Sequence, residues 1–167
     1  CCGNTDCDNG GANGDPHLST FDGLQYSCQG KGDFVLIQAT SGLECHVCFK
    51  SVSSLATLVN GVALTAGGGT PTVELTIAEN GGSLKLSVNG TEINYQLGYE
   101  DDHYRVLTGS IENSIFAKES GVTVYAGLRL PSIFPHFNIR ATLPPSFKVS
   151  SVICGLLGMP DGNPLNA

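Results

Sequence analysis

The sequence is poor in positive charge. Its 8 Lys and Arg residues stand against 15 Asp and Glu residues, which gives a formal net charge of -7 at pH 7. Because proteins bind nucleic-acid backbones through clustered Lys and Arg, this balance argues against a nucleic-acid partner. No apolar run approaches the length of a membrane span. The sequence therefore favours neither a nucleic-acid-binding protein nor a membrane-spanning one.

The chain also lacks the common catalytic motifs. It contains no Gly-x-Ser-x-Gly elbow, no phosphate-binding loop and no His-Glu-x-x-His helix. The four His residues are scattered along the chain and share no evident partner. An acidic run at residues 100–103 indicates a solvated loop more than a metal site. We therefore do not expect an enzyme.

Cysteine, in contrast, is plentiful. Seven Cys residues without an obvious zinc pattern indicate an oxidising, extracellular compartment. The odd number leaves at least one thiol unpaired or available to another chain, and Cys1 or Cys2 could make such a link. The N-terminus has no signal-peptide character and the chain stops abruptly, so we expect a processed chain or a piece of a larger secreted protein.

The composition is typical of a β-rich protein. Only 14% of residues are charged, 41% are hydrophobic and 22 are Gly, so many turns separate many short buried segments. Val73, Leu75 and Ile77 alternate with polar residues, as in a strand with one buried face. The predicted strands lie at residues 34–39, 43–52, 55–59, 62–65, 72–77, 84–89, 92–97, 103–108, 114–118, 122–126 and 136–143.

These strands predict an all-β fold, an antiparallel β-sandwich of two packed sheets with long N-terminal and C-terminal loops and little helix. A Cys- and Gly-rich loop at residues 1–13 precedes a single globular unit at residues 14–167. One short helix could lie within residues 146–157. Two-residue turns that favour positive φ are expected at three Asn-Gly pairs, Asn60-Gly61, Asn80-Gly81 and Asn89-Gly90.

Two motifs near the ends of the chain carry a family resemblance. Residues 14–17 read Gly-Asp-Pro-His, residues 20–23 read Thr-Phe-Asp-Gly, and Tyr26 and Phe34-Val35-Leu36 follow. Residues 153–164 read Ile-Cys-Gly-Leu-Leu-Gly-Met-Pro-Asp-Gly-Asn-Pro. The two runs resemble the opening motif of the von Willebrand factor type D (VWD) domain and its closing motif, Cys-Gly-Leu-Cys-Gly-Asn-Phe-Asp-Gly-Asn. The resemblance covers nearly the whole chain.

The resemblance implies a calcium site between the two motifs. By position, Asp22 and Asp161 would supply carboxylates, Asn163 its backbone carbonyl and Asn166 its side chain, in keeping with the oxygen ligands that calcium prefers. Met159 and Ala167 stand where the family usually has Asn and commonly has Asp. In the alternative interpretation, the two Asp residues merely serve Asp-Gly turns and Cys154 alone pins the closing loop.

The Asp15-Pro16 bond is a candidate for self-cleavage, because some mucin-like VWD domains break it under mildly acidic conditions. The Asp15 carboxyl would attack its own carbonyl carbon to form an anhydride, and the Pro16 nitrogen would leave. His17, next to the bond, could tune protonation because its charge changes in that pH range. In the alternative, the motif serves only turn geometry.

The cysteine pairing stays open at this stage. The disulfide candidates are Cys7, Cys28, Cys45, Cys48 and Cys154. We expect Cys154 to hold the closing loop to an earlier cysteine, with Cys7 the first candidate. Cys45 and Cys48 have CxxC spacing, but residues three apart on a strand point to opposite faces, which is poor geometry for binding one zinc ion. Disulfides to separate partners, or to each other through a β-bulge, are expected instead. The family's second closing Cys is Leu157 here.

Asn89 lies in the one N-glycosylation sequon, Asn89-Gly90-Thr91, and could carry a glycan or simply form a turn. The leading hypothesis is a secreted, non-enzymatic structural or adhesive domain that assembles with copies of itself or other extracellular proteins, with calcium and disulfides. One alternative is an autoproteolytic cross-linking module that acts at Asp15-Pro16. Another is a domain of a secreted protein associated with lipids or small ligands.

Overall fold

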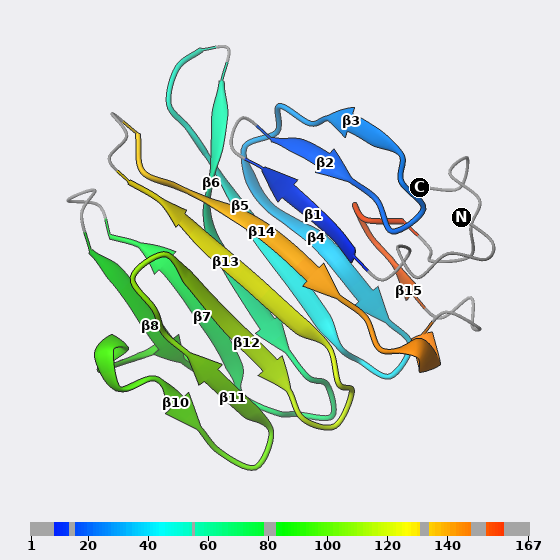
Figure 1. Ribbon diagram of the computed structural model, residues 1–167, viewed down its shortest axis with the longest axis vertical. Coiled ribbons are helices and arrows are strands. Elements are labelled where there is room, and N and C mark those ends of the chain that lie inside the picture. The colour runs from blue at the N-terminus through cyan, green and yellow to red at the C-terminus, as the bar shows by residue number, and fades with distance from the viewer. Residues whose placement is uncertain are drawn as a thin grey trace.

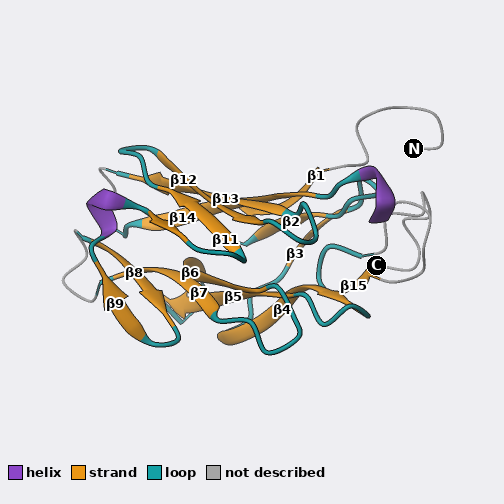
Figure 2. Ribbon diagram, turned by 90° about the horizontal axis from the view of Figure 1, so that it is seen from below, coloured by secondary structure: helices purple, strands orange, loops and turns teal. Residues whose placement is uncertain are grey.

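The computed structural model describes residues 9–13, 16–54, 56–78, 83–130, 134–147 and 153–158. Within these residues, two antiparallel sheets pack face to face (Figure 2). The eight-stranded sheet has the spatial order β10 (Tyr99–Glu100), β11 (Tyr104–Leu107), β12 (Glu112–Ala117), β13 (Thr123–Arg129), β14 (His136–Thr142), β1 (Asn9–Asn13), β2 (His17–Ser19) and β3 (Gln25–Ser27). The predicted all-β sandwich is confirmed.

The second sheet has seven strands in the described residues. Their spatial order is β15 (Ile153–Cys154), β4 (Gly32–Ala39), β5 (Glu44–Ser51), β6 (Thr57–Thr65), β7 (Thr72–Ile77), β8 (Leu84–Val88) and β9 (Thr91–Ile93). The meander from β4 to β9 follows chain order, and β15 returns from the far end of the sequence to pair with β4 (Figure 1). The helix expected within residues 146–157 appears, in the described part, only as the 3-10 turn η3 (Pro145–Phe147).

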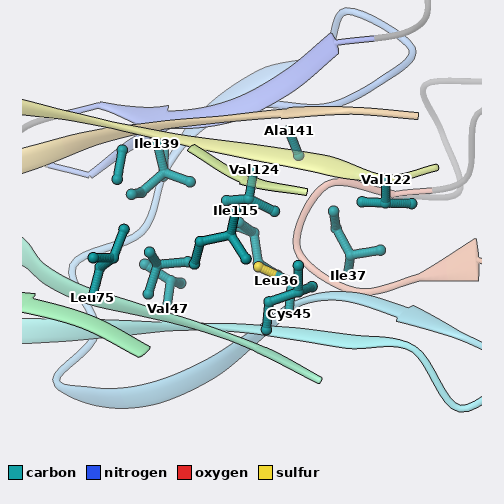
Figure 3. Packing of buried hydrophobic residues seen from close by; sticks show 14 of the residues in the cluster. Leu36, Ile37, Cys45, Val47, Leu75, Ile115, Val122, Val124, Ile139 and Ala141 are labelled. Carbon is teal, nitrogen blue, oxygen red and sulfur yellow. The ribbon is translucent and has the colours of Figure 1, made fainter. Parts of the chain in front are cut away.

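The core lies between the sheets because one face of each strand is apolar. In β7, Val73, Leu75 and Ile77 are buried while Thr72, Glu74 and Thr76 face outward, as the alternation predicts. Figure 3 shows side chains from the two sheets meeting, with Ile115, Val124 and Ile139 opposite Leu36, Val47 and Leu75. Each fully buried aliphatic side chain of this kind stabilises the fold by about 1.5–3 kcal/mol.

Tyr104 links the two sheets by hydrogen bonds. It is fully buried on β11, and its hydroxyl donates to the carbonyl of Pro71 at 2.6 Å and accepts the amide of Ala66 at 2.6 Å. Ala66 and Pro71 belong to the connection between β6 and β7 in the other sheet. Tyr104 thus fixes that connection against the eight-stranded sheet.

Strand β1 departs from the sequence prediction, which placed residues 1–13 in a loop. Asn9–Asn13 instead lie between β14 and β2, paired with both. Ala12 is fully buried, and a Cβ on Gly11 would lie 2.3 Å from the carbonyl oxygen of Ile139. Small residues allow this close approach, and the same small residues erase the apolar alternation that marks other strands.

The predicted turn at Asn60-Gly61 is wrong. Strand β6 runs straight through this pair, because Val59 pairs with Phe49 and Gly61 with Cys48, which leaves Asn60 as the extra residue of a β-bulge. A bulge and a two-residue turn both use an Asn-Gly pair, so the local sequence alone does not separate them. The turn at Asn89-Gly90 is confirmed, with φ of 49° and 74° at the two residues.

The strand predicted at residues 92–97 is correct only for its first two residues. Strand β9 ends at Ile93, and Tyr95–Leu97 form the 3-10 turn η2. The Asn94 side chain caps this turn by accepting the amide of Gln96 at 3.0 Å. Gly98 then allows a backbone approach in which a Cβ would lie 2.6 Å from the Val106 carbonyl oxygen. The expected turn at Asn80-Gly81 lies outside the described residues.

Candidate functional site

The opening and closing motifs meet in space, although more than 120 residues separate them in the chain. The amide of Phe21 donates to the carbonyl of Leu157 at 3.0 Å, and the Tyr26 hydroxyl donates to the carbonyl of Leu156 at 2.5 Å. The amide of Leu156 in turn donates to the carbonyl of Val35 at 3.0 Å. Residues 153–158 are therefore held by backbone contacts to the N-terminal part of the chain on two sides.

Asp22 lies directly beside this junction, in a tight turn. The amide of Gly23 donates to the carbonyl of Thr20 at 3.0 Å, and Gly23 has a φ of 82°. The Asp22 side chain is only 5% exposed. A carboxylate removed from water needs compensation by hydrogen bonds or by a cation, so a buried Asp at this place fits a metal ligand better than a simple surface turn does.

The remaining calcium candidates, Asp161, Asn163 and Asn166, lie outside the described residues, as do Met159 and Ala167. Among the residues that the structure does describe, no three His, Cys, Asp or Glu side chains form a metal-binding group. The described part of the site thus consists of one buried carboxylate next to the segment that leads into the other candidates. The calcium site stays a prediction.

Leu157 occupies the position of the family's second closing cysteine. It is fully buried, and its Cδ1 atom would lie 3.1 Å from a Cβ on Gly10 of β1. The ring of Phe21 would lie 3.2 Å from the same Cβ. In this chain, therefore, an apolar contact joins the closing segment to β1 at the position where the resemblance implies a cysteine. Sequence reasoning noticed the missing cysteine but not the contact that replaces it.

Pro16 and His17 lie at the start of β2. Asn13, at the end of β1, pairs with His17, at the start of β2. The buried Pro16 accepts the amide of Cys28 at 3.0 Å through its carbonyl, and Nδ1 of His17 forms a hydrogen bond with the Ser27 hydroxyl at 2.9 Å. Asp15 lies outside the described residues, so self-cleavage at Asp15-Pro16 stays a prediction.

Four of the seven cysteines lie in the described residues, and no disulfide joins any two of them: Cys28, Cys45, Cys48 and Cys154. Cys45 points into the core and Cys48 lies on the outer face of β5, as the strand geometry of a CxxC spacing predicts. Burial raises the pKa of Cys45 to about 12. Burial, and then a hydrogen bond with Asp33, raises the pKa of Cys48 to about 11.

These raised pKa values keep both thiols protonated at neutral pH, which makes them weak nucleophiles and weak metal ligands. Cys154 is exposed at the edge strand β15, and its thiol lies 3.8 Å from Oε1 of Gln38. Cys1, Cys2 and Cys7 lie outside the described residues. The proposed pairing of Cys154 with Cys7 therefore stays a prediction.

The predicted glycosylation site lies at an exposed hairpin tip. Asn89 is in the turn between β8 and β9, and its Oδ1 accepts the amide of Thr72 at 2.9 Å. The side chain is exposed. This position can accommodate a glycan without disturbing the core, and glycosylation at Asn89 stays a prediction.

The acidic run at residues 100–103 serves local structure. Oδ1 of Asp101 accepts the amides of His103 and Tyr104 at 2.8 and 2.6 Å, which fixes the turn before β11. Glu100 pairs with Arg105 at 2.9 Å and with Lys118 at 3.0 Å, and these hydrogen bonds lower the pKa of Glu100 to about 2. The turn at residues 101–103 agrees with the predicted loop, whereas Glu100 lies in β10.

The fold and this junction define a class of protein: a β-sandwich domain whose C-terminal segment closes onto its own N-terminal motif. A comparison with models of protein families matches residues 10–167 to the von Willebrand factor type D domain. The chain belongs to this family. No curated protein matches the sequence. Among the described residues, no helix has the length and apolar character needed to cross a membrane.

Proposed function

We propose that this chain is a non-enzymatic assembly domain of a secreted glycoprotein, stabilised by calcium. Membership of the VWD family supports this proposal, because VWD domains are typical of secreted proteins that multimerise and generally have no catalytic role. The seven cysteines of the sequence and the sequon at Asn89 are compatible with passage through a secretory compartment. One fold hosts many functions, so the residues of the site decide which function is proposed.

The observation that carries the calcium proposal is the burial of Asp22 next to the closing segment. Asp22 follows Phe21, whose amide holds the Leu157 carbonyl. Asp161, Asn163 and Asn166 come four, six and nine residues after Leu157 in the chain, a separation short enough for their oxygens to reach Asp22. Calcium bound by these oxygens would fasten the closing segment to the opening motif.

Calcium titration tests this proposal. We expect isothermal titration calorimetry to show one site, and calcium to raise the melting temperature of the wild-type chain. Asp22→Asn and Asp161→Asn should each abolish both effects, because calcium affinity follows ligand charge and count. Asp102→Asn, in the exposed loop before β11, is the matched control and should leave both effects unchanged.

The assembly proposal is tested separately by sedimentation velocity of the native chain, before and after reduction, with and without calcium. Concentration-dependent or redox-dependent oligomers support it. A chain that stays monomeric under all four conditions contradicts it, whatever the calorimetry shows.

A further inference from the structure

Exposed apolar side chains are concentrated at one end of the sandwich. The structure exposes six large apolar side chains among the described residues, and only Leu24 lies near the opening motif. Leu97 is 82% exposed and Ile111 is 68% exposed. We call the end formed by the other five the open end: Leu97, Leu107, Ile111, Leu130 and Phe134. Such a gathering on one surface indicates an interaction site more than chance exposure.

Strand register and hydrogen bonds place these five residues at one end. Leu107 ends β11, and Leu130 and Phe134 flank the paired residues Arg129 and His136, where β13 ends and β14 begins. The Tyr95 hydroxyl of η2 donates to the carbonyl of Gly109 at 2.9 Å, which places η2 against the connection between β11 and β12. The amide of Leu128 donates to the carbonyl of Ile111 at 2.8 Å, which places that connection beside the end of β13. In Figure 2, η2 lies between the two layers at the end where β8 and β9 lie.

The open end also contains a hollow of about 600 Å³. Leu84 and Leu128 supply its apolar part, and residues 94–96 and 108–110 supply uncharged polar groups. The lining contains no charged side chain among the described residues. Leu97 and Ile111, the two most exposed large apolar side chains of the described residues, each come directly after a lining segment, residues 94–96 and 108–110.

The hollow is held in shape by a buried hydrogen-bond network. Asn113 is only 1% exposed, and its Oδ1 accepts the Tyr95 hydroxyl at 2.7 Å and the amide of Gly109 at 3.1 Å. Its Nδ2 donates to the carbonyl of Ala126 at 3.2 Å. Because η2, β12 and β13 are joined through one side chain, the two walls are fixed before any partner arrives, which lowers the entropic cost of association.

Two opposite charges flank the open end. Glu112 begins β12 and pairs in register with Gly127, two residues before Arg129 on β13. Both side chains are exposed, and neither forms an ion pair within the described part of the chain. A chain with a net charge of -7 repels its own copies over most of its surface. A hollow whose described lining is uncharged, together with an acid and a base at Glu112 and Arg129, reduces that repulsion at the open end.

We propose that the open end is the contact between two copies of this chain. Apolar side chains of one copy would enter the hollow of the other, and Glu112 would face Arg129 across a two-fold axis. A two-fold contact must be self-complementary, and this surface has both members of each complementary pair. The proposal rests on the assembly function proposed above and names the surface that serves it.

The first test removes the apolar contact. Sedimentation equilibrium of the full chain is compared for the wild type, the double variant Leu97→Gln/Ile111→Gln, and the control Leu24→Gln, after thermal unfolding has shown that each variant is folded. We expect the dimer dissociation constant to rise roughly tenfold or more for each apolar side chain removed in the double variant. The control should match the wild type. A double variant that dimerises like the wild type overturns the proposal.

The second test uses charge reversal. Glu112→Arg alone and Arg129→Glu alone should each weaken the dimer, because each places like charges across the contact. The double reversal Glu112→Arg/Arg129→Glu should restore the wild-type dissociation constant, which a fold defect would not do. A double reversal that is weaker than both single variants overturns the proposal.

Reduction separates this proposal from the assembly function. If open-end variants still multimerise and dissociate only on reduction, then assembly proceeds through disulfides and the surface proposed here is overturned. If the wild type is monomeric in every redox state, both proposals fail together.

Discussion

The two ends of the sandwich differ in how far their apolar side chains are exposed to solvent. At the end where β15 lies, which we call the closed end, residues 156–158 contact the opening motif, and Leu157 is fully buried between β1 and Phe21. At the open end, in contrast, Leu97 and Ile111 stay 82% and 68% exposed. One end therefore buries its apolar side chains within the same chain, whereas the other leaves apolar surface that a second copy can cover.

The largest expected effect comes from Gly11→Ala in β1, the strand against which Leu157 packs. Gly11→Ala places a Cβ 2.3 Å from the Ile139 carbonyl oxygen, so β1 must move out of the sheet. We expect a loss of about 2–4 kcal/mol in the free energy of unfolding, measured by urea denaturation. Gly127→Ala is the control on the other side of β14, because its nearest atom is 3.6 Å away. A Gly11 variant as stable as the control would show that β1 is not tightly inserted.

One substitution at each end measures how much an apolar side chain there contributes to the free energy of unfolding. Leu157→Ala should cost about 2–4 kcal/mol because it leaves a cavity beside β1 and Phe21. Leu97→Ala, at an 82% exposed position, should change the stability of the monomer by no more than about 0.5 kcal/mol. Urea denaturation at low protein concentration, where dimers do not contribute, gives both values. Equal costs would mean that the ends do not differ as described.

A smaller effect is expected at Tyr104, which links the two sheets. Tyr104→Phe removes the hydroxyl that bonds Ala66 and Pro71 and leaves those buried backbone groups without that partner. The expected loss is about 1–3 kcal/mol in the free energy of unfolding. Hydrogen exchange at the Ala66 amide provides a local readout, and unchanged protection there would contradict the role given to Tyr104.

The smallest effect is expected at Glu100, whose ion pairs are exposed. The pKa of Glu100 is lowered from 4.5 to about 2 in the folded chain, so its stabilising contribution is present above pH 4.5 and is lost as the pH falls towards 2. The melting temperature of Glu100→Gln should therefore lie slightly below that of the wild type at neutral pH and converge with it near pH 2. Added salt should shrink the difference at neutral pH. A difference that grows in acid would contradict this sign.

The sequence predicted the fold where apolar alternation is strong. Val73, Leu75 and Ile77 marked β7 because each apolar side chain faces the core and each neighbour faces water. The same logic missed β1, where Gly10, Gly11 and Ala12 allow close packing but have no apolar pattern. It also misplaced a turn at Asn60-Gly61, because only the pairing of β6 with both neighbours distinguishes a bulge from a hairpin.

The candidate site was predictable in part, for a different reason. The family motifs correctly indicated that the opening and closing segments belong together, and Phe21 and Leu157 are indeed joined. They did not predict that Leu157 would pack against Gly10, since that contact depends on β1 being in the sheet. The open end was not predictable, because exposure of Leu97 and Ile111 depends on how η2 and the β11–β12 connection fold.

Hydrogen–deuterium exchange of the full chain, followed by mass spectrometry, at low and high protein concentration tests most directly whether a second copy covers the open end. We expect backbone amides at residues 20–24 and 156–158 to be protected equally at both concentrations, because their own chain covers them. We also expect residues 95–98 and 107–112 to gain protection only at high concentration, when a second copy covers them. Equal exchange of residues 95–98 and 107–112 at both concentrations would contradict this expectation. Protection that rises with concentration only at residues 20–24 and 156–158 would contradict it as well.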